Sequence, residues 1–168
     1  NDNTIKTYQI GFAPDSWDTL TNTIKSLSFN DDVYDKTGLF IKTDRGWRDR
    51  FRSRIMFPIF HQSGKPIAFG GRIFNHDDPA KYLNSPETPL YRKSEVFYGL
   101  HKTRDSIRKF STAVLVEGYT DFLQLVQLGI PNVVALSGTA LGINHASQIR
   151  KFASKVYLAY DGLQIQVD

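Results

Sequence analysis

Cysteine is absent from this 168-residue sequence, and so are the sites that depend on it. Without thiols the chain forms no disulfide and holds no thiolate-bound zinc or iron–sulfur cluster. Histidine is scarce as well, and the four that occur show no metal-ligand spacing, so the sequence assigns no role to His61, His76, His101 or His145.

Long apolar runs are also missing. No stretch approaches the roughly 18 consecutive apolar residues of a membrane span. The first ten residues, NDNTIKTYQI, lack the apolar segment of a signal peptide and do not begin with Met. We therefore expect no membrane partner, and we expect the chain to be an excised part of a longer protein.

Charge is present in modest excess, but it is unevenly distributed. The formal net charge is +4, and residues 42–54, KTDRGWRDRFRSR, hold six basic and two acidic residues interleaved with Trp47 and Phe51. Guanidinium groups beside aromatic rings suit contact with phosphates and stacking on unpaired bases. The alternative is a solvated face whose rings point into the core, and the segment taken alone favours that alternative.

The first two thirds of the chain predict a mixture of helix and antiparallel strands. A helix is expected from Pro14 with Asp15 as its cap and Trp17 on its apolar side, followed by a break over 30–35. Residues 55–60 predict a strand joined by a turn at Ser63-Gly64 to a second strand over 66–69. Residues 75–95 are rich in proline and predict loops.

From about residue 110 the pattern alternates between strand and helix. Strands are predicted over 112–116, 132–136 and 155–160, and helices over 119–128 and 142–153. This order with short connections predicts a parallel sheet with right-handed crossovers. The predicted fold class is therefore α/β, with a mixed α+β part over 1–110 and a Rossmann-type parallel β-α-β-α-β unit over 111–168.

Three carboxylates follow the predicted strands. Glu117 ends the first strand, Asp161 ends the third, and Asp121 lies in the first turn of the helix after Glu117. Ligands of open parallel sheets sit outside the carboxyl ends of the strands. Glu117 alone is compatible with a helix cap and Asp161-Gly162 alone with a turn, but the three together favour Mg²⁺, which prefers oxygen ligands.

These residues carry a family resemblance. The stretch EGYTD (117–121), with a later strand ending in Asp161-Gly162, resembles the Toprim module of topoisomerases and bacterial primases. The chain as a whole is similar to the catalytic core of bacterial DnaG-type DNA primases through IGFAPDSW (10–17), DRFRSRIMFPIF (49–60), AFGGR (68–72), KYLNSPET (81–88), FYGL (97–100), VEGYTDF (116–122) and ALSGTAL (135–141).

The resemblance implies DNA-directed synthesis of short RNA primers by metal-dependent nucleotidyl transfer. It makes Glu117 a metal ligand or general acid/base, with Asp121 and Asp161 as further metal ligands for Mg²⁺ or Mn²⁺. It assigns nucleotide binding to Arg72, Lys81, Tyr82, Asn84 and Lys93, and template or primer binding to Arg50, Arg52 and Arg54.

The resemblance also implies partners. They are a single-stranded DNA template, ribonucleoside triphosphates, the nascent RNA primer and, through a domain not contained in this chain, a replicative helicase of the primosome. The expected location is the bacterial cytoplasm.

One departure from the family pattern affects the predicted chemistry. The family has Asp-Gly-Asp where this chain has Asp161-Gly162-Leu163, so the later metal-binding aspartates are absent and the Toprim unit is truncated. The departure leaves open a non-catalytic module that binds single-stranded nucleic acid. A Toprim nuclease or topoisomerase would share Glu117 and Asp161, but KYLNSPET has no place in it.

Overall fold

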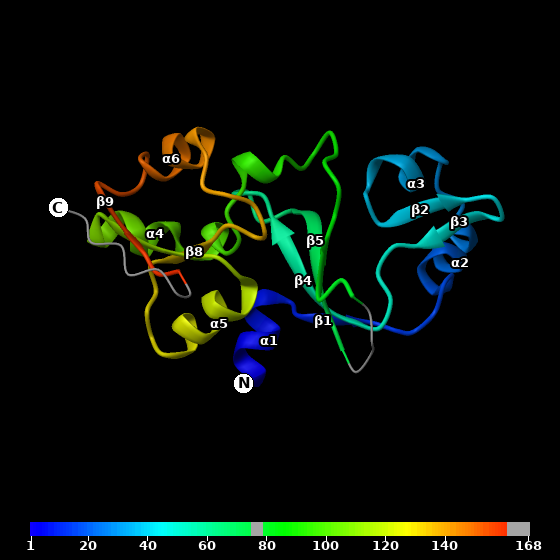
Figure 1. The fold of residues 1–168 in the computed structure, drawn as a ribbon, viewed down its shortest axis with the longest axis horizontal. Helices are drawn as coiled ribbons and strands as arrows, with labels where there is room; N and C mark the ends of the chain where they lie inside the picture. The colour runs from blue at the N-terminus through cyan, green and yellow to red at the C-terminus, as the bar shows by residue number, and fades with distance from the viewer. Residues whose placement is uncertain (75–78, 161–168) are drawn as a thin grey trace. The chain divides into compact units, whose positions relative to one another are not determined.

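The computed structural model describes residues 1–74 and 79–160 and divides into two compact units (Figure 1). The first unit is Asn1–His61 with Lys65–Arg92, and the second is Gln62–Gly64 with Lys93–Asp168. Among the described residues, no helix is both long and apolar enough to cross a lipid bilayer. Each unit has its own sheet, so each is described by itself.

The first unit combines three helices with two antiparallel sheets. In chain order its elements are α1 (Asp2–Tyr8), β1 (Gly11–Ala13), α2 (Thr19–Ser26), α3 (Asp32–Lys36), β2 (Phe40–Thr43), β3 (Gly46–Asp49), β4 (Arg54–Phe60), β5 (Pro66–Ile73) and β6 (Tyr82–Asn84). One sheet has the order β1-β4-β5-β6, and β2 pairs with β3 in the other.

The predicted hairpin is confirmed as β4 and β5. Gly64 has a φ of +83° in the connecting turn, a backbone conformation that glycine adopts without strain. Pro58 lies inside β4 although it has no N–H to donate. Pro58 pairs with Phe69 of β5 on one side, and on the other side β1 pairs with β4 only over Arg54–Met56, so no residue of β1 lies opposite Pro58.

The predicted start of the first long helix is wrong. The helix α2 begins at Thr19, and Asp15 does not cap it. Its first free amides are bound instead by the buried carboxylate of Asp49, which accepts from Leu20 N at 2.7 Å and Thr21 N at 2.8 Å. The predicted break over 30–35 also contains a short helix, α3.

The second unit has the predicted parallel sheet. Its elements are η1 (Lys93–Glu95), α4 (Leu100–Phe110), β7 (Thr112–Val116), α5 (Tyr119–Gln127), β8 (Val133–Ala135), α6 (Ile143–Ile149) and β9 (Lys155–Leu158). Both pairs in the order β8-β7-β9 are parallel, which confirms the α/β fold class. The helix α4, which precedes residue 111, belongs to this compact unit.

The core of the second unit explains the strand positions. Ala113 and Leu115 alternate along β7 and pack with Ile107 of α4 and Ile149 of α6. Val116, the last residue of β7, is also buried, and the chain emerges from the sheet at Glu117, which is exposed. The carboxylate of Glu117 therefore follows the carboxyl end of the central strand of this sheet.

Candidate functional site

Glu117 lies at the rim of a cavity of about 460 Å³ at the carboxyl end of the parallel sheet. The cavity lies in the second unit, at the edge where ligands of open parallel sheets bind. It is lined by Glu117, Leu136, Gly138, Thr139, Ala140, Leu141, Leu158 and Tyr160.

Asp121 lies in the first turn of α5, close to Glu117 in sequence. Its Oδ2 accepts a hydrogen bond from Gly118 N at 3.2 Å, which closes the start of the helix. A Cβ on Gly118 would lie 2.9 Å from that oxygen, so a larger residue there would require the Asp121 carboxylate to shift. One carboxylate oxygen of Asp121 is thus committed to the helix, while the exposed Glu117 faces the cavity.

Asp161, the third predicted ligand, lies outside the described residues. Within residues 1–74 and 79–160, no group of three or more histidine, cysteine, aspartate or glutamate side chains is placed to hold a metal ion. The part of the site that is described nevertheless fits Mg²⁺, because Glu117 supplies a hard oxygen donor beside open space that water and phosphate oxygens can fill.

Tyr160 is a site residue that the sequence did not identify. Burial raises the pKa of its phenol, and the negative charge of Glu117 raises it further. Its Oη is buried and finds no hydrogen-bond acceptor among the described residues. The phenol therefore stays protonated at neutral pH and is available to donate a hydrogen bond inside the cavity.

The loop after β8 forms another wall of the cavity. Ser137 and Gly138 follow each other with φ values of +60° and +78°. The stretch ALSGTAL was recognised as a family motif, but its strained backbone beside Glu117 was not foreseen. Thr139 brings a hydroxyl group to the same cavity.

Three predicted nucleotide-binding residues share one face of the antiparallel sheet. Arg72 pairs with Tyr82 across β5 and β6, and Asn84, two residues further along β6, pairs with Gly70. Directly paired residues and residues two apart in a strand point to the same side.

The nucleotide-binding candidates differ in burial, and two of them lie outside the shared face. The Nε of Arg72 is buried and has no hydrogen-bond acceptor among the described residues. Lys81 is exposed, and its carbonyl accepts from Ile73 N at 3.0 Å at the edge of the same sheet. Lys93 lies in η1 and belongs to the second unit.

The arginines at 50, 52 and 54 do not lie on one regular strand. Residues 50–53 lie between β3 and β4, and Ser53 has a φ of +47°. Arg54 is only 2% exposed and donates from Nη1 to the Ala80 carbonyl at 2.9 Å. It therefore holds the chain before β6 instead of presenting its guanidinium to solvent.

Arg50 connects the basic stretch to the nucleotide-binding face. Its Nε and Nη2 donate to the Asn84 carbonyl at 3.3 and 3.2 Å. Burial lowers the pKa of Arg50 from its ordinary value. Phe51, the next residue, is buried, as the alternative interpretation of this segment expects.

Arg52 is partly exposed and stacks on the ring of Trp17. Its guanidinium carbon lies 3.3 Å from the centre of the Trp17 ring, and Nη1 lies 3.7 Å from Asp15 Oδ1. Trp17 is 51% exposed, whereas the sequence placed it on the apolar side of a helix. A cavity of about 670 Å³ beside it is lined by Ser16, Trp17, Asp18, Thr43, Asp44, Arg45 and Arg48.

Comparison with known families matches both parts of the chain. Residues 1–104 match the N-terminal domain of the DNA primase catalytic core, and residues 111–162 match the Toprim domain. The chain is 42% identical over 160 residues to a DNA primase of Halalkalibacterium halodurans and 40% identical over 157 residues to one of Listeria monocytogenes. The alignments cover 94% and 93% of this chain but only 26% and 25% of those proteins.

Solved structures show the same fold. The RNA polymerase domain of the Mycobacterium tuberculosis primase DnaG superposes with a TM-score of 0.90 at 34% identity, covering 98% of this chain and 56% of that one. A DnaG primase catalytic domain solved bound to single-stranded DNA gives a TM-score of 0.85 at 36% identity, covering 98% and 51%. The chain thus spans about a quarter of its curated relatives and about half of these solved domains.

Proposed function

This chain belongs to the DnaG-type DNA primase family, and from that premise we propose that it contributes to DNA-directed synthesis of short RNA primers on single-stranded DNA. The reaction class is metal-dependent nucleotidyl transfer. The observation that carries the proposal is Glu117, an exposed carboxylate that lines a cavity at the carboxyl end of the parallel sheet. The match of residues 1–104 to the primase catalytic core supports primase over a Toprim nuclease or topoisomerase.

Glu117, Asp121 and Asp161 are the proposed ligands of Mg²⁺, for which Mn²⁺ would substitute. When bound, such an ion neutralises charge on phosphate oxygens and lowers the pKa of a coordinated hydroxyl. The chain's own part is to hold Glu117 at the end of β7, where no sheet neighbour covers it. One carboxylate oxygen of Asp121 already accepts a hydrogen bond from Gly118 N, so we propose that Asp121 contributes less to metal binding than Glu117 does. Tyr160 adds a protonated phenol to the same cavity.

Nucleotide binding is proposed for Arg72, Lys81, Tyr82, Asn84 and Lys93. The shared face of Arg72, Tyr82 and Asn84 supports this role for those three. Arg suits two-point contact with phosphate, and Lys supplies a point charge.

Template or primer binding is proposed for Arg50 and Arg52, and we add Trp17 to this proposal. A half-exposed indole with a guanidinium stacked on it offers a base a flat surface and a phosphate a positive charge. Arg54 was predicted to share this role, but its buried guanidinium donates to the carbonyls of Gly71 and Ala80. We therefore propose a structural role for Arg54.

The wider setting is proposed from the family. Residues 1–110 would bind nucleotide and nucleic acid, and residues 111–168 would carry the metal site. The whole protein would act in the bacterial cytoplasm with a replicative helicase in the primosome. A solved DnaG catalytic domain bound to single-stranded DNA supports single-stranded DNA as the proposed template.

The first experiment is titration calorimetry of Mn²⁺ into this chain and into Glu117→Gln. We expect binding by the wild type and its loss in the variant, because the amide removes the charge that attracts the cation. Glu95→Gln, an exposed carboxylate on η1, is the matched control and should bind as the wild type does. Loss of binding in the control as well, or no binding by the wild type, would contradict a site at Glu117.

The second measurement is ribonucleotide incorporation on a single-stranded template. Removing one electrostatic catalytic group costs on the order of a hundred- to a thousand-fold in rate, and we expect a loss of that size for Glu117→Gln. Leu163 in place of the family's second aspartate favours the other candidate, a non-catalytic module. That module would retain single-stranded DNA without forming product.

A further inference from the structure

The charged residues of the second unit are segregated between the two ends of its sheet. Glu117 and Asp121 follow the carboxyl end of β7. Five basic residues lie toward the opposite end, in the last turn of α4, directly after α6 and at the start of β9. We name the basic end surface for the five residues that form it, Arg108, Lys109, Arg150, Lys151 and Lys155.

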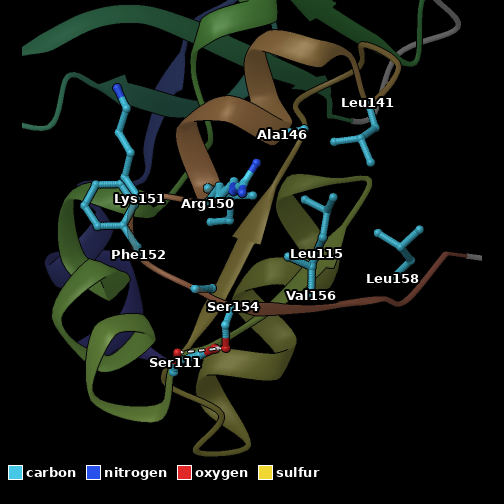
Figure 2. Close-up of a pocket in the computed structure, with 12 residues that line it drawn as sticks. Ser111, Leu115, Leu141, Ala146, Arg150, Lys151, Phe152, Ser154, Val156 and Leu158 are labelled. Atoms are coloured by element: carbon cyan, nitrogen blue, oxygen red, sulfur yellow. Dashed lines mark hydrogen bonds between the residues drawn. The ribbon is translucent and has the colours of Figure 1, made fainter.

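Backbone and side-chain contacts join the segments that carry these cations. The loop before β7 and the loop before β9 are joined by Ser154 N donating to the Ser111 carbonyl at 2.9 Å and by the Ser111 and Ser154 hydroxyls at 3.0 Å. Figure 2 shows this pair below Arg150 and Lys151. Arg108 reaches across from α4, with its guanidinium carbon 4.8 Å from the centre of the Phe152 ring.

The basic end surface is poorly neutralised. All five residues are exposed. Arg108 lies 3.7 Å from Asp105, itself 80% exposed. Among the described residues, Lys109, Arg150, Lys151 and Lys155 form no ion pair. Such a concentration of unpaired charge attracts a polyanion.

Aromatic rings flank the cations. Phe110 and Tyr157 are 52% and 50% exposed, and a lysine lies over each ring: Lys109 at 6.0 Å from the first and Lys155 at 4.6 Å from the second. Arg150 and Lys151 also border a cavity of about 830 Å³ whose floor includes Leu115 and Val156 (Figure 2).

We propose that the basic end surface binds single-stranded nucleic acid, with its cations on phosphates and its rings available to bases. The combination of cations with exposed rings is that of sequence-tolerant single-strand binding. A free phosphate would use the charges but neither ring. The surface is distinct from Arg50, Arg52 and Trp17, and it lies at the opposite end of the sheet from Glu117. It would guide a template or product strand away from the chemistry.

The test compares oligonucleotide binding by two triple variants of the full chain. Arg150→Gln, Lys151→Gln and Lys155→Gln together remove three charges of the basic end surface. Lys6→Gln, Lys25→Gln and Lys65→Gln together remove three exposed charges of the first unit and serve as the matched control. Fluorescence anisotropy with labelled single-stranded DNA and with RNA of the same sequence gives affinity as a function of salt.

We expect the first triple variant to bind at least about tenfold more weakly near 0.1 M salt, with the salt slope reduced by about two, since each single-strand phosphate contact contributes about 0.7. Loss with DNA alone would assign the surface to template, and loss with RNA alone to product. Tyr157→Ser should weaken binding without changing the slope, because it removes a ring and no charge.

Equal affinities and slopes in the two triple variants would overturn the proposal. A second result would also overturn it: the first triple variant loses binding of polyglutamate but binds oligonucleotides unchanged. The surface would then bind an acidic protein instead of nucleic acid. Arg52→Ala tests the proposed template site separately from the basic end surface. It should lower oligonucleotide affinity in the wild type and in the first triple variant. If it did not, the template site at Arg52 would be contradicted and the basic end surface would not.

Discussion

Asp49 and Arg54 are charged residues whose roles depend on partners distant in sequence. Both lie in a basic segment that predicts surface exposure, and both are buried. The carboxylate of Asp49 accepts three hydrogen bonds from the start of α2, including one from Thr21 Oγ1 at 2.7 Å. Buried charge persists only where such partners satisfy it.

We predict that Asp49→Ala lowers the free energy of unfolding by roughly 2–4 kcal/mol, because it leaves two helix amides and a buried hydroxyl without an acceptor. Both tryptophans, Trp17 and Trp47, lie in the same unit, so urea unfolding followed by tryptophan fluorescence is the measurement. Asp44→Ala, at an exposed turn, should change the value by less than about 0.5 kcal/mol. Equal effects of the two substitutions would contradict the capping role.

Gly99 and Gly129 allow a comparison of backbone strain with steric exclusion. Their φ values are +84° and +85°, but a Cβ on Gly99 would lie 2.1 Å from the ring of Phe122, while a Cβ on Gly129 would meet nothing within 4 Å. We predict that Gly129→Ala costs about 1 kcal/mol from strain alone and that Gly99→Ala costs roughly 3 kcal/mol or more.

Thermal unfolding followed by far-ultraviolet circular dichroism measures this difference. Adding Phe122→Leu to Gly99→Ala should recover part of the loss, because it removes the ring that the new methyl group meets. If the two glycine variants were equally stable, Phe122 would not be what requires glycine at position 99.

The start of α6 depends on a histidine to which the sequence assigned no role. His145 is 0% exposed. Its Nδ1 accepts from Gly142 N at 3.4 Å and its Nε2 lies 2.9 Å from the Lys93 carbonyl, to which it donates in this tautomer. The neutral ring thus joins α6 to η1. Burial lowers the pKa of His145 although nearby carbonyls raise it.

We predict that unfolding becomes easier as the pH falls below about 6.5. Burial, followed by Lys102 and Arg104, lowers the pKa of His101 to about 4 from its ordinary 6.5, so between these values the unfolded chain binds a proton that the folded chain does not. Chemical unfolding at pH 7 and pH 5 measures the effect. His101→Gln with His145→Asn should flatten it, and His61→Gln, at an exposed position, should not. An unchanged pH dependence in the double variant would contradict this assignment.

For the molecule as a whole, nucleic-acid binding depends on where the positive charges lie more than on their small excess. The first unit carries Arg52 on Trp17, and the second carries acidic and basic groups at opposite ends of its sheet. A net charge of +4 says little about binding, whereas exposed cations beside exposed rings predict where a single strand would lie.

We predict that binding of single-stranded DNA weakens steeply with salt. If about four phosphates are contacted, the slope of about −0.7 per contact lowers affinity about fiftyfold between 50 and 200 mM salt. Fluorescence anisotropy across that range measures it. Affinity that stayed constant with salt would exclude phosphate contact as its main source.

Local patterns in the sequence were enough to predict part of this structure. The alternation over 112–160 predicted the parallel strands, and the end of the apolar run at Val116 predicted that Glu117 follows the carboxyl end of the first one. Continuous stretches such as KYLNSPET and EGYTD were sufficient for the family. These inferences hold because strand periodicity and short motifs involve residues that are neighbours in the chain.

Which charged and aromatic side chains are buried depends on contacts between distant parts of the chain. Asp49 binds α2 from 28 residues away, Arg54 binds a carbonyl 26 residues away, and Arg50 binds one 34 residues away. Nothing in the local pattern separates them from Arg52, whose guanidinium stays on the exposed ring of Trp17. The physical reason is that a polar group is buried only where the folded chain supplies its hydrogen-bond partners, and those partners come from distant segments.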